Sequence, residues 1–282
     1  MVRRLRFLLI LSCLVFVGQA NAQFDDPKTL EVGPHAGVSY YMGDLNPLYP
    51  FAMPQLEYGG VARFNYNNRW TFRADYSYVT VKADDKIIKW RPERELNFTS
   101  KIHDLSFVAE FNFLEYYTGN PKRNVSPYIF GGISVFYYTA YAMVGDTLVD
   151  FNDLEHQTEP DPSDPKWYDK AFGQNSPIGI SIPFGMGVKL ALSKHMAATV
   201  EWRMQKTFTD YLDDVGTVYP ADDQHAIYTA DDGTEYDLTD PTGIYKPGQQ
   251  RGNSAFNDWF GMARVSLTWK FNLPDGRGCN LK

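Results

Sequence analysis

Charged side chains recur at every second position in several segments of this sequence, and their chemistry is that of ion pairs or proton transfer. Lys189, Glu201 and Arg203 alternate with apolar residues, and Gly185 and Gly187 share their face. Similar alternation places charged residues between apolar ones in other segments. We expect eight charged residues to line one enclosed polar surface: Arg63, Arg73, Asp75, Glu110, Lys189, Glu201, Arg203 and Arg264. Enclosed charges are costly unless they are paired, so this set predicts mutual ion pairs.

Motifs for catalysis or metal binding do not occur in the sequence. No two of the five histidines have the H-x-x-x-H spacing of metal ligands, and there is no G-x-S-x-G nucleophile motif. A phosphate-binding loop and a dinucleotide fingerprint are also missing. We therefore predict a protein that is not an enzyme and has no catalytic, cofactor-binding or metal site.

The element that must position these charges is a hairpin between residues 183 and 205. Phe184, Met186, Val188, Leu190 and Leu192 share one face, and alternation resumes after Ser193-Lys194-His195. A period of two indicates strands, and a three-residue break between strands indicates a hairpin. Residues that pair directly share a face, so the register predicts Gly187 opposite Glu201 and Gly185 opposite Arg203.

A second hairpin follows the same rule earlier in the chain. Strands near residues 56–66 and 70–82 flank Asn67-Asn68-Arg69. The register places Arg63 opposite Arg73, a like-charge pair. We expect Asp75 to reach both arginines and offset their repulsion.

Eight strands of this kind follow one another between residues 30 and 271. The connections after the first, third, fifth and seventh strands are long, whereas those after the second and sixth have three residues and that after the fourth about a dozen. This alternation predicts an all-β fold: an eight-stranded antiparallel transmembrane β-barrel with short periplasmic turns, long extracellular loops and both termini in the periplasm. The fifth strand, residues 127–142, is aromatic on both faces, so its facing is left unassigned.

The alternative is a secreted β-sandwich or lipocalin-like barrel, which shows similar alternation. The aromatic ends of the long apolar faces and the alternating loop lengths favour the membrane barrel. An eight-stranded barrel is only wide enough for side chains to fill it. The enclosed charges therefore predict a packed, ion-paired interior and not a pore.

The N-terminus has the pattern of a secretory signal peptide. Arg3, Arg4 and Arg6 precede an apolar run, and Ala20-Asn21-Ala22 forms an A-x-A cleavage site. We expect residues 1–22 to be the signal peptide and 23–282 the outer-membrane barrel domain. Without the signal, 24 basic residues face 34 acidic ones, which argues against a nucleic-acid partner. Cys279 is then the single remaining cysteine, so no internal disulfide is expected.

Charge is segregated between the two sides of the predicted barrel. The long loops 143–176 and 210–251 hold eighteen acidic residues and four basic ones, whereas bases recur near the short turns. One interpretation is a solvated outer surface; the sharper one is a basic periplasmic rim that binds an acidic partner through Lys122, Arg123 and Lys194. A further alternative is a structural or adhesive barrel whose acidic loops bind divalent cations or an extracellular ligand, although their spacing does not match an EF-hand.

Three segments carry a resemblance to a known family. They are YYMGDLNP (40–47), PYIFGGISVFYY (127–138) and, most specifically, KTFTDYLDDVGTVYP (206–220). The chain resembles the PorG-like outer-membrane barrels associated with the type IX protein secretion system. The resemblance implies a non-catalytic outer-membrane component that contacts a periplasmic ring or lipoprotein of that machinery. The residues that match its motif are Gly43, Asp44, Phe208, Asp210, Tyr211, Asp213 and Asp214. The long acidic fourth loop and the cysteine in the tail depart from the family pattern.

The most specific segment also has a purely structural interpretation. It follows the seventh strand, so Phe208 and Tyr211 would belong to an outer aromatic girdle. Asp210, Asp213 and Asp214 would cap the loop backbone as Asx turns.

Overall fold

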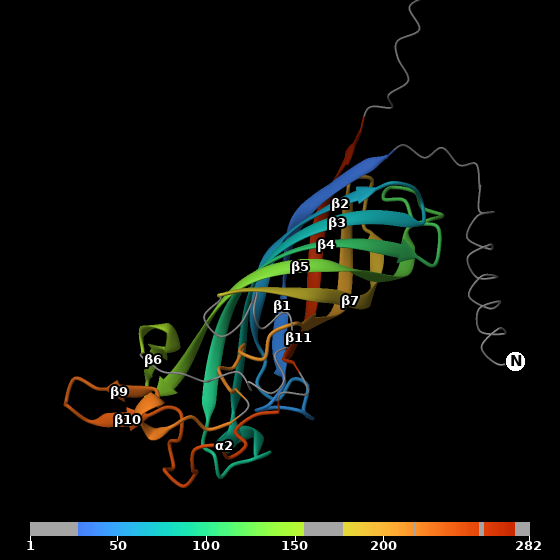
Figure 1. The fold of residues 1–282 in the computed structure, drawn as a ribbon. Coiled ribbons are helices and arrows are strands. Elements are labelled where there is room, and N and C mark those ends of the chain that lie inside the picture. Colours follow the sequence, from blue (N-terminus) through green and yellow to red (C-terminus); the bar gives the residue numbers. More distant parts are fainter. Residues whose placement is uncertain (1–27, 155–176, 217, 254–256, 274–282) are drawn as a thin grey trace, which may run out of the picture.

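The computed structural model describes residues 28–154, 177–216, 218–253 and 257–273. The predicted signal peptide and Cys279 lie outside these ranges. The chain forms a barrel of eight long strands (Figure 1). These strands are β1 (Thr29–Met42), β2 (Gln55–Asn65), β3 (Trp70–Asp84), β4 (Asn97–Asn112), β5 (Val125–Val144), β7 (Ile178–Ala191), β8 (Met196–Thr207) and β11 (Trp259–Asn272). Each pairs antiparallel with both neighbours, and β1 closes the barrel against β11, which confirms the predicted eight-stranded antiparallel barrel.

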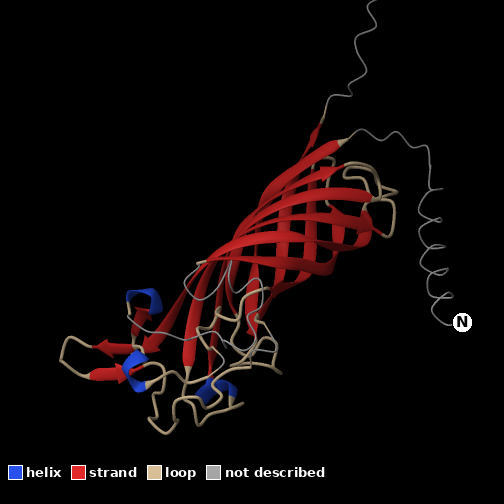
Figure 2. Cartoon of the chain, in the orientation of Figure 1, coloured by secondary structure: helices blue, strands red, loops and turns tan. Residues whose placement is uncertain are grey.

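The two ends of the barrel differ. At the turn end, short connections join β2 to β3, β4 to β5 and β7 to β8, and the first and last strands begin and end there. At the loop end lie the long connections, with β6 (Thr147–Asp150), β9 (Ile227–Thr229), β10 (Glu235–Asp237) and the helical segments α2 (Asp85–Ile88), η1 (Phe151–Asp153) and η2 (Asp222–Gln224). Figure 2 shows all three helical segments at that end. Within the described ranges, no helix has the length and apolar character needed to cross a membrane.

The predicted register is confirmed in both hairpins. Gly187 pairs with Glu201 and Gly185 with Arg203 across β7 and β8. Arg63 pairs with Arg73 across β2 and β3. Because the side-chain period in a strand is two, this register directs every charged partner to the same side of the wall.

The fifth strand, whose facing the sequence left open, directs its even-numbered aromatics inward. Tyr128 and Phe130 are buried, whereas Ile129 and Ile133 are exposed. The inward rings are used as cation–π partners: Arg73 lies 4.7 Å from the centroid of Phe130, and Lys189 lies 4.9 Å from that of Tyr128.

The outer surface carries a continuous apolar band edged by aromatic residues. Contacting rings of Tyr58, Tyr78, His103 and Tyr137 mark its edge toward the loop end. At the turn end, Trp70 packs on Phe111. Trp70 and Tyr78 are eight residues apart on β3, which corresponds to roughly 19 Å of height at a tilt of about 45°. With the rings added, this band matches the apolar height of a bilayer-spanning barrel.

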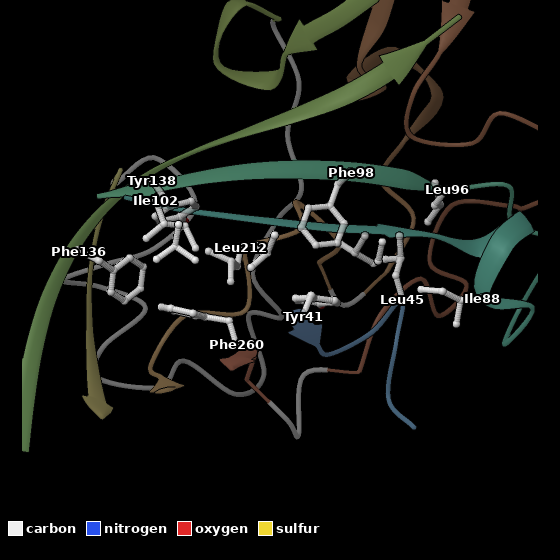
Figure 3. Packing of buried hydrophobic residues seen from close by; sticks show 14 of the residues in the cluster. Tyr41, Leu45, Ile88, Leu96, Phe98, Ile102, Phe136, Tyr138, Leu212 and Phe260 are labelled. Atoms are coloured by element: carbon white, nitrogen blue, oxygen red, sulfur yellow. The ribbon is translucent and has the colours of Figure 1, made fainter. Parts of the chain in front are cut away.

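Strands β3, β4 and β5 continue beyond the closed part of the wall. β3 pairs with β2 as far as Val79 and with β4 as far as Asp84. The inner face of this extension is apolar and belongs to the largest hydrophobic core, in which Leu212 lies among Phe136, Phe260 and Tyr41 (Figure 3). A smaller core, including Val149, joins β5, β6 and the β9–β10 hairpin into a compact head.

Candidate functional site

The eight charged residues inferred from alternation all lie inside the barrel, where none is more than 4 % exposed. Glu110 binds three of the bases. Its Oε1 lies 3.3 Å from Arg63 Nε and 2.7 Å from Arg73 Nη1, and its Oε2 binds Lys189 Nζ. One carboxylate therefore joins β2, β3, β4 and β7.

Asp75 and Glu201 form the other half of the network. Asp75 lies 2.7 Å from Arg73 Nε, 3.0 Å from Arg264 Nη2 and 3.4 Å from Arg203 Nη1. Glu201 binds Arg73 and lies 2.8 Å from Arg264. The expectation that Asp75 reaches Arg63 is wrong, because Asp75 is directed at the bases of β8 and β11 and Glu110 takes its place beside Arg63.

Sequence reasoning missed several buried carboxylates. Asp104 pairs with Arg203 at 3.4 Å, Glu57 lies 3.2 Å from His35, and Glu31 accepts a hydrogen bond from Thr118. Asp104 has the parity of Glu110 on β4 and Glu57 that of Arg63 on β2, whereas Glu31 has the parity of the buried His35 on β1, so alternation would have found all three. With them the interior is close to balanced in charge, and the arrangement is an ion-paired core that ties the strands together.

One internal group has the composition of a catalytic triad. Glu57 contacts His35 Nδ1, and Ser77 Oγ lies 3.5 Å from His35 Nε2. However, His35 Nε2 is also 3.2 Å from the carbonyl oxygen of Tyr76 and 3.5 Å from Arg264 Nη1, so Ser77 is only one of three neighbours of this nitrogen. All three residues are buried, which keeps substrate away from the hydroxyl. We assign the group to the structural interior.

No group of three or more His, Cys, Asp or Glu side chains in the described part of the chain is arranged to hold a metal ion.

The motif segments meet at the loop end. Tyr41, beside Gly43 and Asp44, directs its hydroxyl at Asp213 Oδ2 (2.6 Å) and at Asp258. The backbone N–H of Asp44 donates to the same hydroxyl at 3.0 Å. Residues more than 160 positions apart in sequence thus form one cluster inside the mouth of the barrel.

Segment 208–216, which we call the plug, folds into that mouth. Tyr211 is 6 % exposed and therefore does not belong to the outer girdle, contrary to expectation, while Phe208 is half-buried. The predicted Asx cap occurs at Asp213, whose Oδ1 accepts the N–H of Val215 at 2.9 Å. Asp214 has a left-handed backbone (φ 57°) and its carbonyl accepts from Arg251 at 2.7 Å, while Asp210 is buried in the same segment.

Burial dominates the electrostatics of this cluster. It raises the pKa of Asp213 to about 8, with the nearby Asp44 carboxylate adding to the effect. Burial and the neighbouring Asp213 also raise the pKa of Asp258 well above its usual range. The pKa of Asp44 is raised by burial as well, although Asn253 and nearby arginines oppose the shift.

The turn end holds a groove between the β4–β5 and β7–β8 connections, with a volume of about 280 Å³. Lys194 lines the groove from the β7–β8 connection. Lys122 belongs to the β4–β5 connection, which forms the opposite wall. Both lysines are exposed. Arg123, the third predicted rim base, lies 3.2 Å from Glu115 and is half-buried. Behind the groove, Thr118 is buried and its carbonyl accepts from Lys270, so this connection also covers the barrel interior.

Among solved structures, the chain is similar to several bacterial outer-membrane barrels. OprG from Pseudomonas aeruginosa shares 11 % identity, with 88 % of this chain and 97 % of that chain covered and a TM-score of 0.41. Neisserial surface protein A (NspA) shares 11 % identity over 86 % and 97 % of the two chains, with a TM-score of 0.39. The N-terminal barrel domain of Pseudomonas aeruginosa OprF shares 12 % identity over 86 % and 97 %, with a TM-score of 0.36.

None of the curated proteins compared with the chain matches it. A family model does match, over residues 5–157, more than half of the sequence. The chain belongs to the family described as DUF6089, a domain of unknown function.

Proposed function

We propose that this protein is a non-catalytic outer-membrane barrel of the type IX secretion machinery. The turn end and both termini face the periplasm, and the head faces outward. The apolar outer band with its two aromatic edges supports insertion into a bilayer. The secretion role itself rests on the resemblance of the motif segments.

The observation that carries a docking role is the groove at the turn end. Lys122 and Lys194 are exposed beside it, and neither has an ion pair within the described chain. Such a rim favours an acidic segment of a periplasmic ring component or lipoprotein, since complementary charge speeds encounter and fixes orientation. Arg123 contributes less, because Glu115 already neutralises it.

A pull-down of tagged protein from detergent-extracted envelope tests this proposal. Periplasmic secretion components should follow the native barrel, and the double variant Lys122→Glu/Lys194→Glu should recover roughly tenfold less of them. Lys246→Glu, an exposed lysine of the loop end, serves as the matched control and should recover native amounts. A barrel that emerges alone, or equal recovery from all variants, would contradict the docking role. Normal cargo secretion in a deletion strain would contradict the machinery role.

A second candidate function is binding of an extracellular ligand at the head. The hydrophobic core that the acidic fourth loop shares with β5 and β6 gives this loop a defined shape. Ile227, Tyr236 and Ile244 remain 40–62 % exposed on it, which is typical of contact surfaces. Replacing the β9–β10 hairpin by a short turn should then abolish surface adhesion while leaving partner recovery unchanged.

A further inference from the structure

The Tyr41 hydroxyl lies between two buried carboxyl groups. Its oxygen is 2.6 Å from Asp213 Oδ2 and within hydrogen-bond distance of Asp258 Oδ1. Tyr41, Asp213 and Asp258 are each only 1–2 % exposed. Two of these oxygen atoms that face each other without a proton between them would therefore repel each other without being hydrated by water.

The number of protons in this arrangement determines its charge. The hydroxyl has one proton and can donate it to one carboxylate. The N–H of Asp44 donates to the hydroxyl oxygen and supplies nothing to the acids. The outer oxygens accept backbone N–H groups, Asp213 Oδ1 from Val215 and Asp258 Oδ2 from Leu212 (3.0 Å). The second contact between Tyr41 and a carboxyl thus requires a proton on that carboxyl.

Among the residues that the structure describes, no arginine or lysine side chain contacts either carboxyl group of this pair. Arg94 donates to Asp85 (2.8 and 3.0 Å) and to the carbonyls of Arg251 and Asp44. Arg251 donates to the carbonyl of Asp214, and Arg91 lies 3.4 Å from Glu93. The other titratable groups that face the pair are Asp44 after β1, Tyr138 on β5, and Asp210 and Asp214 in the plug.

Both carboxyls hold the plug in place. Asp213 belongs to the plug itself, and Asp258 precedes β11 and accepts the N–H of Leu212. Leu212 and Val215 are buried in the core of Figure 3, and Ser100 of β4 donates to the carbonyl of Leu212. Two ionised carboxylates bridged by one hydroxyl would repel each other across the junction between plug and wall.

We propose that Asp213 and Asp258 share one proton through Tyr41, and that loss of this proton releases the plug from the loop-end mouth of the barrel. The plug is held in the mouth at low pH, when the shared proton is present, and is released at high pH. It depends on the geometry of the mouth and not on the secretion role.

We call Tyr41, Asp213 and Asp258 the latch. Hydrogen exchange of the plug amides in the full-length barrel in detergent micelles tests whether the latch holds the plug. After correction for intrinsic exchange, protection at residues 209–216 should fall by about tenfold per pH unit from about pH 6 to about pH 8, the dependence expected for one linked proton, and level off toward about pH 9.5. Amides of β3 and β4 should stay protected, which separates release of the plug from global unfolding.

The variant Asp213→Asn retains the shape of the side chain without its charge, so its plug should remain protected at about pH 9.5. Asp258→Asn should behave in the same way and replaces it if the first variant does not fold. Asp232→Asn, an exposed acid of the loop end, is the control and should titrate like the native protein. Equal native protection at both pH values, or an unchanged titration in both latch variants, would overturn the proposal.

Discussion

Arg63 and Arg73 lie directly opposite each other on β2 and β3, and both guanidinium groups bind the same oxygen of Glu110. Glu110→Gln should remove the charge that holds them and also leave Lys189 without its partner. Breaking a buried ion pair by removing one partner costs about 3–5 kcal/mol. Urea unfolding in detergent micelles measures the loss, with Glu93→Gln on the exposed Arg91 pair as the control. A loss below about 1 kcal/mol, as for surface pairs, would show that the network is not needed for stability.

The free energy of unfolding should depend on pH through Asp213. Its folded pKa of about 8 exceeds the ordinary value of 3.8, so the folded chain keeps a proton that the unfolded chain releases. This contribution is fully present below about pH 4 and is lost as the pH rises toward about 8, at up to about 1.4 kcal/mol per pH unit. Urea midpoints across this range should therefore fall more steeply for the native protein than for Asp213→Asn. Parallel profiles for the two proteins would contradict the assignment.

Gly119 should not tolerate a side chain. Its φ is +94°, and an added Cβ would lie 2.7 Å from the carbonyl oxygen of Lys194. Gly233 has a similar φ of +82° with nothing within 4 Å, so Gly233→Ala measures the backbone cost alone. Gly119→Ala should cost about 1–3 kcal/mol more than Gly233→Ala in urea unfolding. Equal losses for the two variants would mean that the turns that carry Gly119 and Lys194 move apart at little cost.

Gly43 is required by the latch. An added Cβ would lie 2.0 Å from the Tyr41 hydroxyl and 2.2 Å from Asp258 Oδ1. Gly43→Ala should therefore expose the plug to limited proteolysis at neutral pH. Gly60→Ala, whose new Cβ would meet nothing closer than 3.8 Å, should keep the native cleavage pattern. Identical digestion of the two variants would count against a tight fit around Tyr41.

A charged residue placed in the apolar outer band should destabilise the barrel more, the nearer it lies to the middle of the band. Ile133, at 68 % exposure, lies near the middle of the band, and Ile244, at 62 %, lies in the fourth loop. In liposomes, Ile133→Arg should cost about 2–4 kcal/mol of unfolding free energy and Ile244→Arg about 0–1. A soluble barrel would show little cost at either position.

Much of the barrel follows from alternation alone. Strand identity, the register of both hairpins and the inward set of charges were predictable because a period of two fixes which side chains share a face. Partner choice was not. Asp75 reaches Arg73 on its own strand as expected, but its other partners are on β8 and β11 and not at Arg63, because parity carries no information across the interior.

The cluster at Tyr41 was predictable only as separate motif segments. Tyr211 was assigned to the girdle because the plug follows a membrane-band strand, and nothing in the local sequence indicates that the chain turns inward there. The burial of Leu212 depends on Phe136 and Phe260, which belong to distant strands. The facing of β5 was also undetermined, because aromatic residues on its inner side bind cations that other strands supply.

The continuation of β3, β4 and β5 past Val79 has a consequence for neighbours in the plane of the membrane. A uniform cylinder would present the same profile in every direction, but here an overhang rises above β4 and a low rim lies opposite. The barrel is therefore not the same in all directions around its axis, because one side of its wall is taller than the other. A neighbouring molecule would therefore meet a taller wall at β3, β4 and β5 than at β8 or β11, so its contacts would depend on the side from which it approaches.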